Sequence, residues 1–311
     1  MMPVKFQNVM LAFIAWSLVG YAVGQSADAA DPGFSAGGLL LRRSNQNDSV
    51  LAQSAVDPAR QITSDSIDHD FSGGFELSLT KAINRGTYGQ LRYFGWFESP
   101  SNGSLVTVPG ELVQLNSAVP IVSPAGSSVD LRTDSSLHSV EANRLVRFNE
   151  DISLIFGVRY LNLSEDLSIG SPDTVAESAA TTDTHNNLFG GQVGLDATLF
   201  RRDGFSLSLV GKGGLMLNYL EQDSSASTTA ATIFSSDSDD EVAFAGELNL
   251  RGSMRLNSAA SLTAGYQALW LANVVLADDQ LGATNFFTND GLADSGDVLF
   301  HGFNLGLQLN Y

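Results

Sequence analysis

The sequence contains no cysteine, which excludes disulfide bonds and thiolate metal sites. Charged residues make up only 16% of the 311 residues, well below the ~25% of ordinary soluble domains. Basic residues are scarce, since 16 Lys and Arg stand against 34 Asp and Glu to give a net charge of −18. That balance cannot neutralise phosphates, so a nucleic-acid partner is excluded. Long apolar runs are absent after the amino terminus, so any membrane insertion must use strands.

The amino terminus has the features of a secretory signal peptide. Lys5 precedes an apolar run over 9–23, and small residues then offer cleavage sites. The run is shorter than the ~20 apolar residues that a membrane-spanning helix needs, which disfavours an anchor. We therefore expect residues 1–29 to be a cleaved signal peptide and residues 30–311 to form one domain.

The clearest strand pattern lies between Leu188 and Tyr219. Two segments there alternate apolar and polar residues, with the period of two that a strand with one apolar and one polar face requires. Arg201 to Gly204 joins them as a tight hairpin turn. Strands this long exceed the roughly five or six residues usual in soluble domains, whereas a transmembrane strand needs about 9–11 tilted residues.

The same alternation recurs along the chain and predicts ten strands. They cover 34–43, 71–80, 88–98, 137–148, 152–163, 188–199, 205–219, 242–254, 260–271 and 298–311. Short turns alternate with long loops, of which 99–133 is expected to be the longest and 165–186 and 221–240 are two others. Outer-membrane barrels have this asymmetry, with short periplasmic turns and long external loops. The predicted fold is therefore all-β, a single antiparallel transmembrane β-barrel of about 10 strands (roughly 8 to 12). An exported soluble β protein is the alternative.

Charged residues recur on the polar face of these strands at similar depth, and in a barrel they would form a belt around the lumen. The belt comprises Glu76, Arg92, Glu141, Arg159, Asp196, Lys212, Glu247 and Arg251. Unpaired charges away from bulk water are costly, and about ten strands enclose a narrow interior. We expect the belt either to plug the lumen as paired charges or to line a selective conduit. Facing Arg92 inward also brings Phe94 and Trp96 inward, which predicts a bulge or a bulky plug.

Two acid–histidine groups, Asp68-His69-Asp70 and Asp183-Thr184-His185, invite comparison with omptins. Those ten-stranded surface proteases place an acid pair opposite an Asp-x-His pair, and a His held by a carboxylate can activate water. Strand parity turns Asp183 and His185 toward the lipid side, however, so polar rim residues are the simpler interpretation. No catalytic residue is expected.

An acidic run in the 221–240 loop region is a weak candidate for a metal site. Its carboxylates are Asp237, Asp239, Asp240 and Glu241. They could hold a hard cation such as Ca²⁺, or let divalent ions bridge the surface to lipopolysaccharide. Their spacing matches no binding loop, so a solvated acidic loop is the alternative. The four histidines have no ligand spacing either, and no cofactor is expected.

Several segments resemble the planctomycete outer-membrane β-barrel porin family, the seventh of the β-barrel porin families. The matching segments are FGVRYLNLSEDLSI (156–169), THNNLFGGQVGLDATLF (184–200), GYQALWLANVVLADDQ (265–280) and FHGFNLGLQLNY (300–311). The family favours Gly-x-Arg-Tyr-Leu before an acidic residue, and an Asn-x-Phe-Tyr-Gly-Gly-Gln-x-Gly element. Here Leu188-Phe189 replaces the aromatic pair, and Ser164-Glu165-Asp166 reorders the acidic site. The resemblance implies an outer-membrane barrel, and a pore.

These observations predict a porin-like channel or a structural envelope protein with a narrow, salt-bridged lumen. An adhesin with a plugged lumen is the alternative, and an omptin-like protease a remote one. Expected partners are outer-membrane lipid, divalent cations at the external loops, and the barrel-insertion machinery, which would meet the terminal aromatic Tyr311. The expected location is the outer membrane of a Gram-negative-type bacterium. A conducting lumen should favour cations, because the mouth is acidic.

Overall fold

The structure is a computed structural model that describes most of the chain. The described residues are 32–45, 50–54, 57, 59–64, 69–98, 101–106, 112–115, 120–122, 128–170, 179–227, 231–283 and 296–310. The expected signal peptide, Asp68 and Tyr311 lie outside them. Within the described residues, no helix has both the length and the apolar character needed to cross a membrane.

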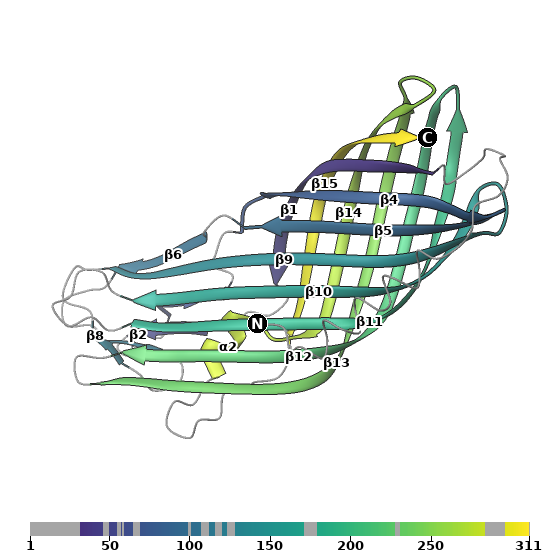
Figure 1. Ribbon diagram of the computed structural model, residues 1–311. Helices are drawn as coiled ribbons and strands as arrows, with labels where there is room; N and C mark the ends of the chain where they lie inside the picture. Colours follow the sequence, from purple (N-terminus) through teal and green to yellow (C-terminus); the bar gives the residue numbers. More distant parts are fainter. Residues whose placement is uncertain are drawn as a thin grey trace.

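Ten strands close into one antiparallel barrel, as predicted. In ring order after β1 (Gly33–Asn45) come β4 (Ser72–Asn84), β5 (Thr87–Phe97), β9 (Ser128–Arg147), β10 (Ile152–Gly170), β11 (Ala179–Arg202), β12 (Phe205–Ser227), β13 (Thr232–Arg255), β14 (Ala260–Val274) and β15 (Gly296–Asn310). Pairing of β15 with β1 and of β9 with β10 completes the ring. Figure 1 shows the long strands and, at one end, the tight turns together with the carboxyl terminus.

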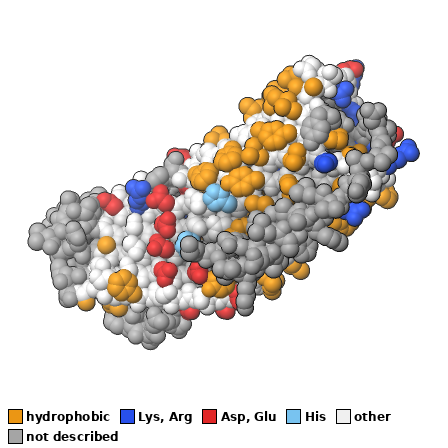
Figure 2. Space-filling model, in the orientation of Figure 1, with side chains coloured by type: hydrophobic (Ala, Val, Ile, Leu, Met, Phe, Trp, Pro, Cys, Tyr) orange, Lys and Arg blue, Asp and Glu red, His pale blue; other side chains and the backbone are white. Residues whose placement is uncertain are grey.

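The apolar face of each strand points out of the barrel. On β12, Leu215 and Leu217 are 68% and 65% exposed. The residues that alternate with them, Met216 and Asn218, are each 1% exposed. Other outward residues of the same band include Phe75, Val193 and Phe303. On the face that Figure 2 shows, hydrophobic side chains gather toward the short-turn end of the barrel. A soluble protein would bury these side chains, so the structure excludes the soluble alternative and supports a transmembrane barrel.

Turn chemistry explains the tight hairpins at the short-turn end. Asp203 and Gly204 both have positive φ, 48° and 85°, as a two-residue turn matched to the twist of its strands requires. Gly86 has φ 76° in the turn between β4 and β5. Two further hairpins, between β9 and β10 and between β13 and β14, close this end.

The opposite end differs from the prediction, because several strands extend much further. The segments predicted as loops at 165–186 and 221–240 belong largely to strands β10 to β13, and β9 begins at Ser128 within the predicted loop 99–133. The ladder is continuous there, with Glu165 opposite Thr184. On β11 to β13 the sequence signal fails because outward and inward residues above the hydrocarbon are both mostly polar. On β10 the alternation persists, but the apolar residues, Leu167 and Ile169, face inward.

Smaller elements occupy the same outer end, where loops were expected. β2 (Val50–Ser54), β3 (Gln61–Thr63), β7 (Leu112–Leu115) and β8 (Pro120–Val122) form a second sheet, and β6 (Ser101–Val106) pairs with β9. A helix, α2 (Ala277–Ala283), follows β14. Leu51 of β2 and Leu281 of α2 are fully buried among inward residues of β9 to β12. The outer end of the barrel is therefore filled from within.

Candidate functional site: the filled lumen

Strand β10 passes every layer of the lumen and orders them from the short-turn end outward. Its inward side chains are Ile155, Arg159, Leu161, Leu163, Glu165, Leu167 and Ile169, all at most 3% exposed. Ile155 belongs to a small apolar cluster, Arg159 to the charge belt, and Leu161 and Leu163 to the main apolar cluster. Glu165 marks a second polar layer, and Leu167 and Ile169 an outermost apolar one. Polar and apolar layers thus alternate along the axis.

Two buried carboxylates form the centre of the charge belt. Glu141 lies 2.8 Å from the Lys212 Nζ and 2.9 Å from the Arg92 Nη1. Glu247 lies 2.7 Å from the Arg92 Nη1, 2.8 Å from the Arg159 Nη1 and 3.1 Å from the Lys212 Nζ. Because each carboxylate has several cationic partners, both charges are compensated despite burial.

The belt bridges the lumen instead of lining it. Arg92 on β5 and Glu247 on β13 are not on neighbouring strands, and neither are Lys212 on β12 and Glu141 on β9. Their ion pairs must therefore cross the interior. Three cations, Arg92, Arg159 and Lys212, meet three carboxylates, since Glu76 also lies 3.1 Å from Arg92. A neutral, cross-linked group of this kind fills a narrow barrel.

Not every predicted belt residue joins this group. Asp196 and Arg251 form a separate pair at 3.6 Å with half-exposed side chains, nearer the short turns. Conversely, buried amides that the sequence analysis did not select complete the belt. The Gln192 Nε2 donates to Glu141 at 2.8 Å and to the Asn143 Oδ1 at 2.7 Å. The sequence feature that could have identified these amides is their position on the inward face of their strands. Gln192 shares that face of β11 with Asp196.

Aromatic side chains seal the lumen directly outside the belt. Trp96 on β5 and Phe300 on β15 pack edge to face across the interior with centroids 5.1 Å apart. Phe94 lies under the guanidinium groups of Arg92 and Arg159, at 5.4 and 5.6 Å. Of the two expectations for this strand, the bulky plug is correct, since β5 pairs without a bulge from Tyr88 to Trp96.

A second buried ion pair lies further out. Arg43 on β1 contacts the Glu165 Oε1 at 2.9 Å and the Asp278 Oδ1 of α2 at 3.7 Å. The backbone N–H of Ala277 donates to the Glu165 Oε2 at 3.0 Å. Burial raises the pKa of Glu165 to about 7, with Asp278 adding to the rise and Arg43 opposing it. This layer joins two wall strands to the helix inside the lumen.

Outside the hydrocarbon band, acidic side chains line up across the outer wall. Asp134, Asp166, Asp183 and Asp223 are direct neighbours in register on β9 to β12. Figure 2 shows the acidic row beyond the hydrophobic band. Partial burial raises the pKa of Asp183, and Asp166 raises it further. Like charges placed opposite one another destabilise a sheet, so this row costs stability at neutral pH.

The described residues of the two acid–histidine groups, which exclude Asp68, do not assemble into an omptin-like site. His69 is buried and its Nδ1 lies 2.6 Å from the Glu98 Oε1, an acid that the sequence analysis did not consider. Asp70 is exposed. Asp183 belongs to the outer acidic row, and the His185 Nδ1 lies 3.0 Å from the Ser164 Oγ of the neighbouring strand. Each group therefore has local structural partners.

The acidic run near 237–241 lies in strand β13 and not in a loop. Successive strand residues face opposite sides, so Asp239 and Asp240 point away from each other and the four carboxylates cannot converge. In the part of the chain that the structure describes, no group of three or more His, Cys, Asp or Glu side chains is arranged to hold a metal.

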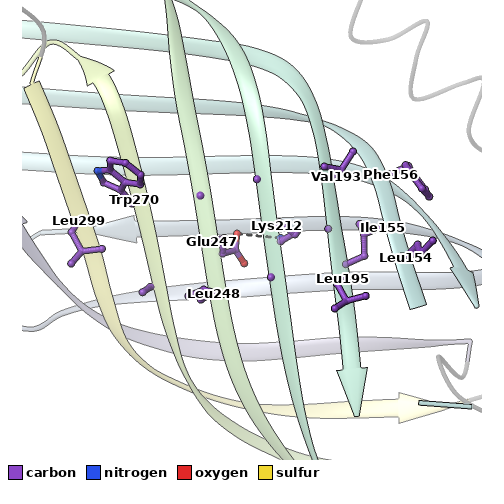
Figure 3. A pocket seen from close by; sticks show the side chains of 15 residues that line it. Leu154, Ile155, Phe156, Val193, Leu195, Lys212, Glu247, Leu248, Trp270 and Leu299 are labelled. Atoms are coloured by element: carbon purple, nitrogen blue, oxygen red, sulfur yellow. Dashed lines mark ion pairs between the residues drawn. The ribbon is translucent and has the colours of Figure 1, made fainter. Parts of the chain in front are cut away.

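A hollow of about 660 Å³ indents the wall at the level of the belt. Its outward lining is apolar, with Phe156, Val193, Leu248 and Trp270 around glycines of β12 and β13. In Figure 3 the Lys212–Glu247 ion pair lies among the residues that line it. The hollow belongs to the lipid-facing band, where hydrocarbon covers apolar walls.

One of the solved structures that match this chain shows the same fold. The outer membrane protease OmpT from Escherichia coli matches with a TM-score of 0.50 and 8% identity, covering 93% of this chain and all of that one. The translocator domain of the autotransporter NalP from Neisseria meningitidis matches with a TM-score of 0.41 and 11% identity, over 99% and 95%. The toluene transporter TodX from P. putida matches with a TM-score of 0.38 and 9% identity, over 91% of each chain. No curated protein matches.

One family model covers residues 111–311, which include strands β9 to β15. Its description is "Putative beta barrel porin-7 (BBP7)". The match spans most of the chain and includes Arg159, Gln192 and Glu247 of the belt. The closed ring with its outward apolar band is the architecture that an outer-membrane porin family requires. The chain therefore belongs to the beta barrel porin-7 family and is an outer-membrane β-barrel of the porin type.

Proposed function

We propose that this barrel is a structural envelope protein whose lumen is closed in the state described. The observation that carries the proposal is the set of ion pairs across the lumen, from Arg92 to Glu247 and from Lys212 to Glu141. Trp96 and Phe300 meet across the next layer. Water-filled porins are wider and leave their polar interior open. Passage of a solute would require several of these layers to separate.

Planar-bilayer recording of the refolded mature chain tests this. We expect no steady current at neutral pH from wild type. The Glu141→Ala,Glu247→Ala double variant, if it folds, should also give no steady current, because the Trp96–Phe300 layer and the layers beyond it stay in place. A steady wild-type current would overturn the closed barrel, and its ion preference would then test the expectation of cation selectivity.

An adhesin or interaction barrel is the second candidate, favoured by the extension of β9 to β13 beyond the hydrocarbon band. That extension carries the row Asp134, Asp166, Asp183 and Asp223 on its outer face. A rigid wall above the membrane suits contact with other surface components. Surface binding lost on deletion of the extension, with the barrel intact, would support this role.

Other parts of the proposal concern export and chemistry. We infer that the chain reaches a Gram-negative-type outer membrane through the signal peptide 1–29 and is inserted through its last strand. We also infer that it is not a protease, which the separate partners of His69 and His185 support. Peptide cleavage that is lost in His69→Ala or His185→Ala would contradict this.

A further inference from the structure

The described part of the connection after β14, up to Ala283, turns into the barrel instead of remaining at its rim. Asn273 has a φ of 60°, a left-handed conformation that redirects the chain, and the β14–β15 register shifts at the same place. Val274, Val275 and Leu276 then enter the interior and are at most 1% exposed. α2 follows and contacts β2, β10 and β11 (Figure 1). We call 273–283 the inserted segment.

Two asparagines of the wall bind the backbone of the inserted segment. The Asn186 Nδ2 donates to the Val275 carbonyl at 2.7 Å, and its Oδ1 accepts from the Val275 N–H at 2.8 Å. Asn218 donates to the Asn186 Oδ1 at 3.1 Å and to the Asn273 carbonyl at 3.3 Å. Asn186 therefore binds both the N–H and the carbonyl of one residue, Val275, with the two ends of its side-chain amide.

The Arg43–Glu165 pair forms the second attachment. Glu165 accepts from the Ala277 N–H at the start of α2, and Arg43 lies 3.7 Å from Asp278 in the next position. Val274 and Leu276 pack in the main apolar cluster, and Ala277 and Leu281 in the outermost one. The inserted segment thus connects three successive layers of the outer lumen.

The barrel does not depend on this segment for its wall. Beyond Val274 the segment takes part in none of the strand pairings among the described residues, and β14 pairs with β15 independently of it. α2 has seven residues, too few to be a stable helix without its packing. Departure of residues 275–283 would break the side-chain attachments and apolar contacts but no ladder of the ring, since Val274, which pairs with Gly296, stays in β14.

We propose that residues 275–283 of the inserted segment are a releasable plug of the outer lumen, held by Asn186 and by the Arg43–Glu165 pair, and that alkaline pH favours their release. The proposal rests on the closed lumen of the proposed function. It adds that the lumen is closed by two parts, an outer one that can move and the charge belt, which stays in place. Arg92, Glu141 and Glu247 of the belt lie closer to the short-turn end than the segment and do not contact it.

Charge explains the direction of the pH effect. Glu165 faces Arg43 from β1, Asp278 from α2, and Glu98, itself bonded to His69, at the end of β5. Asp279 of α2 also acts on Arg43. One arginine thus serves several carboxylates. With its pKa raised to about 7 under the plug, Glu165 ionises more easily once the lumen is hydrated. Raising the pH through neutrality therefore favours the released state, and acid favours the inserted one.

The absence of native cysteine allows a direct test by labelling. Ala277→Cys places a thiol at a position that is 1% exposed, so an impermeant maleimide reacts only after release. Rates are divided by those of Ser238→Cys, an exposed outer-wall position, to remove the pH dependence of the thiol itself. We expect the normalised rate to rise about tenfold between roughly pH 5.5 and 8.5, and to stay constant with pH when Glu165→Gln is added.

A matched pair of variants tests the asparagine attachment at acid pH. Asn186→Ala should raise the normalised rate about tenfold, whereas its neighbour Asn187→Ala should not. Asn187 accepts from Tyr160 on the outer face, at 2.8 Å. An unchanged rate in folded Asn186→Ala, or a pH response that persists with Glu165→Gln, would overturn the proposal. If Asn186→Ala fails to fold, the Glu165→Gln comparison decides. Wild-type conductance tests the closed belt separately, since release of the plug leaves that belt in place.

Discussion

The two carboxylates at the centre of the belt show how burial increases the energetic effect of losing a charge. Glu141 has no exposed surface and accepts from Lys212, Arg92, Gln192 and Asn143. Glu141→Gln should lower the free energy of unfolding by about 3–5 kcal/mol, because it leaves buried cations uncompensated. Urea unfolding in lipid vesicles measures this change.

Glu76 provides the control for that prediction. It pairs with Arg92 at 3.1 Å, but its side chain is 24% exposed and water can replace it. Glu76→Gln should therefore cost less than about 1 kcal/mol. Equal losses in the two variants would mean that the belt is hydrated and that the lumen is open to water.

The outer acidic row gives a pH dependence of definite sign. Asp183 has a raised pKa in the fold, so its contribution to stability is full below its ordinary carboxyl range and is lost as pH rises through the raised value. Asp183→Asn should raise the free energy of unfolding at neutral pH by about 0.2–1 kcal/mol at low salt. Asp134→Asn should not stabilise, because Asp134 pairs with Arg132 at 3.1 Å. Thermal unfolding at two salt concentrations distinguishes them.

At the scale of the strand, two adjacent glycines differ in what surrounds them. A Cβ at Gly190 would overlap the Leu215 carbonyl oxygen, whereas one at Gly191 would meet no atom within 4 Å. Gly190→Ala should cost about 1–3 kcal/mol, and Gly191→Ala should be nearly neutral. Heat-modifiable migration on gels gives the fraction folded, and comparable losses in both would contradict the β11–β12 register.

The predicted and observed strands differ in an instructive way. Within the membrane, lipid on one side and polar contacts on the other impose the contrast that reveals a strand. Beyond it, on β12, outward residues such as Asp223 and inward ones such as Ser224 are both polar, so the same ladder leaves no such pattern there. The inserted helix α2 was missed for another reason, since seven residues cannot show a helical period.

At the scale of the whole molecule, the band of outward apolar residues marks the part of the barrel that is surrounded by lipid. Leu215→Arg places a charge inside this band and should lower stability in lipid by about 2–4 kcal/mol. Ser238→Arg, on the polar extension, should be close to neutral. Refolding yield and unfolding in vesicles compare the two. Tolerance of Leu215→Arg would place the hydrocarbon boundary elsewhere.

The sequence by itself determined that the chain forms a barrel and which side faces lipid, because alternation and turn residues act locally along each strand. It also determined that Glu76, Arg92, Glu141, Arg159, Lys212 and Glu247 face the lumen. Only the tertiary structure decided that these charges meet across the interior, that Asp196 and Arg251 stand apart, and that 273–283 enters the barrel. Those facts depend on contacts between strands that are not neighbours, and such contacts form only when the ring closes.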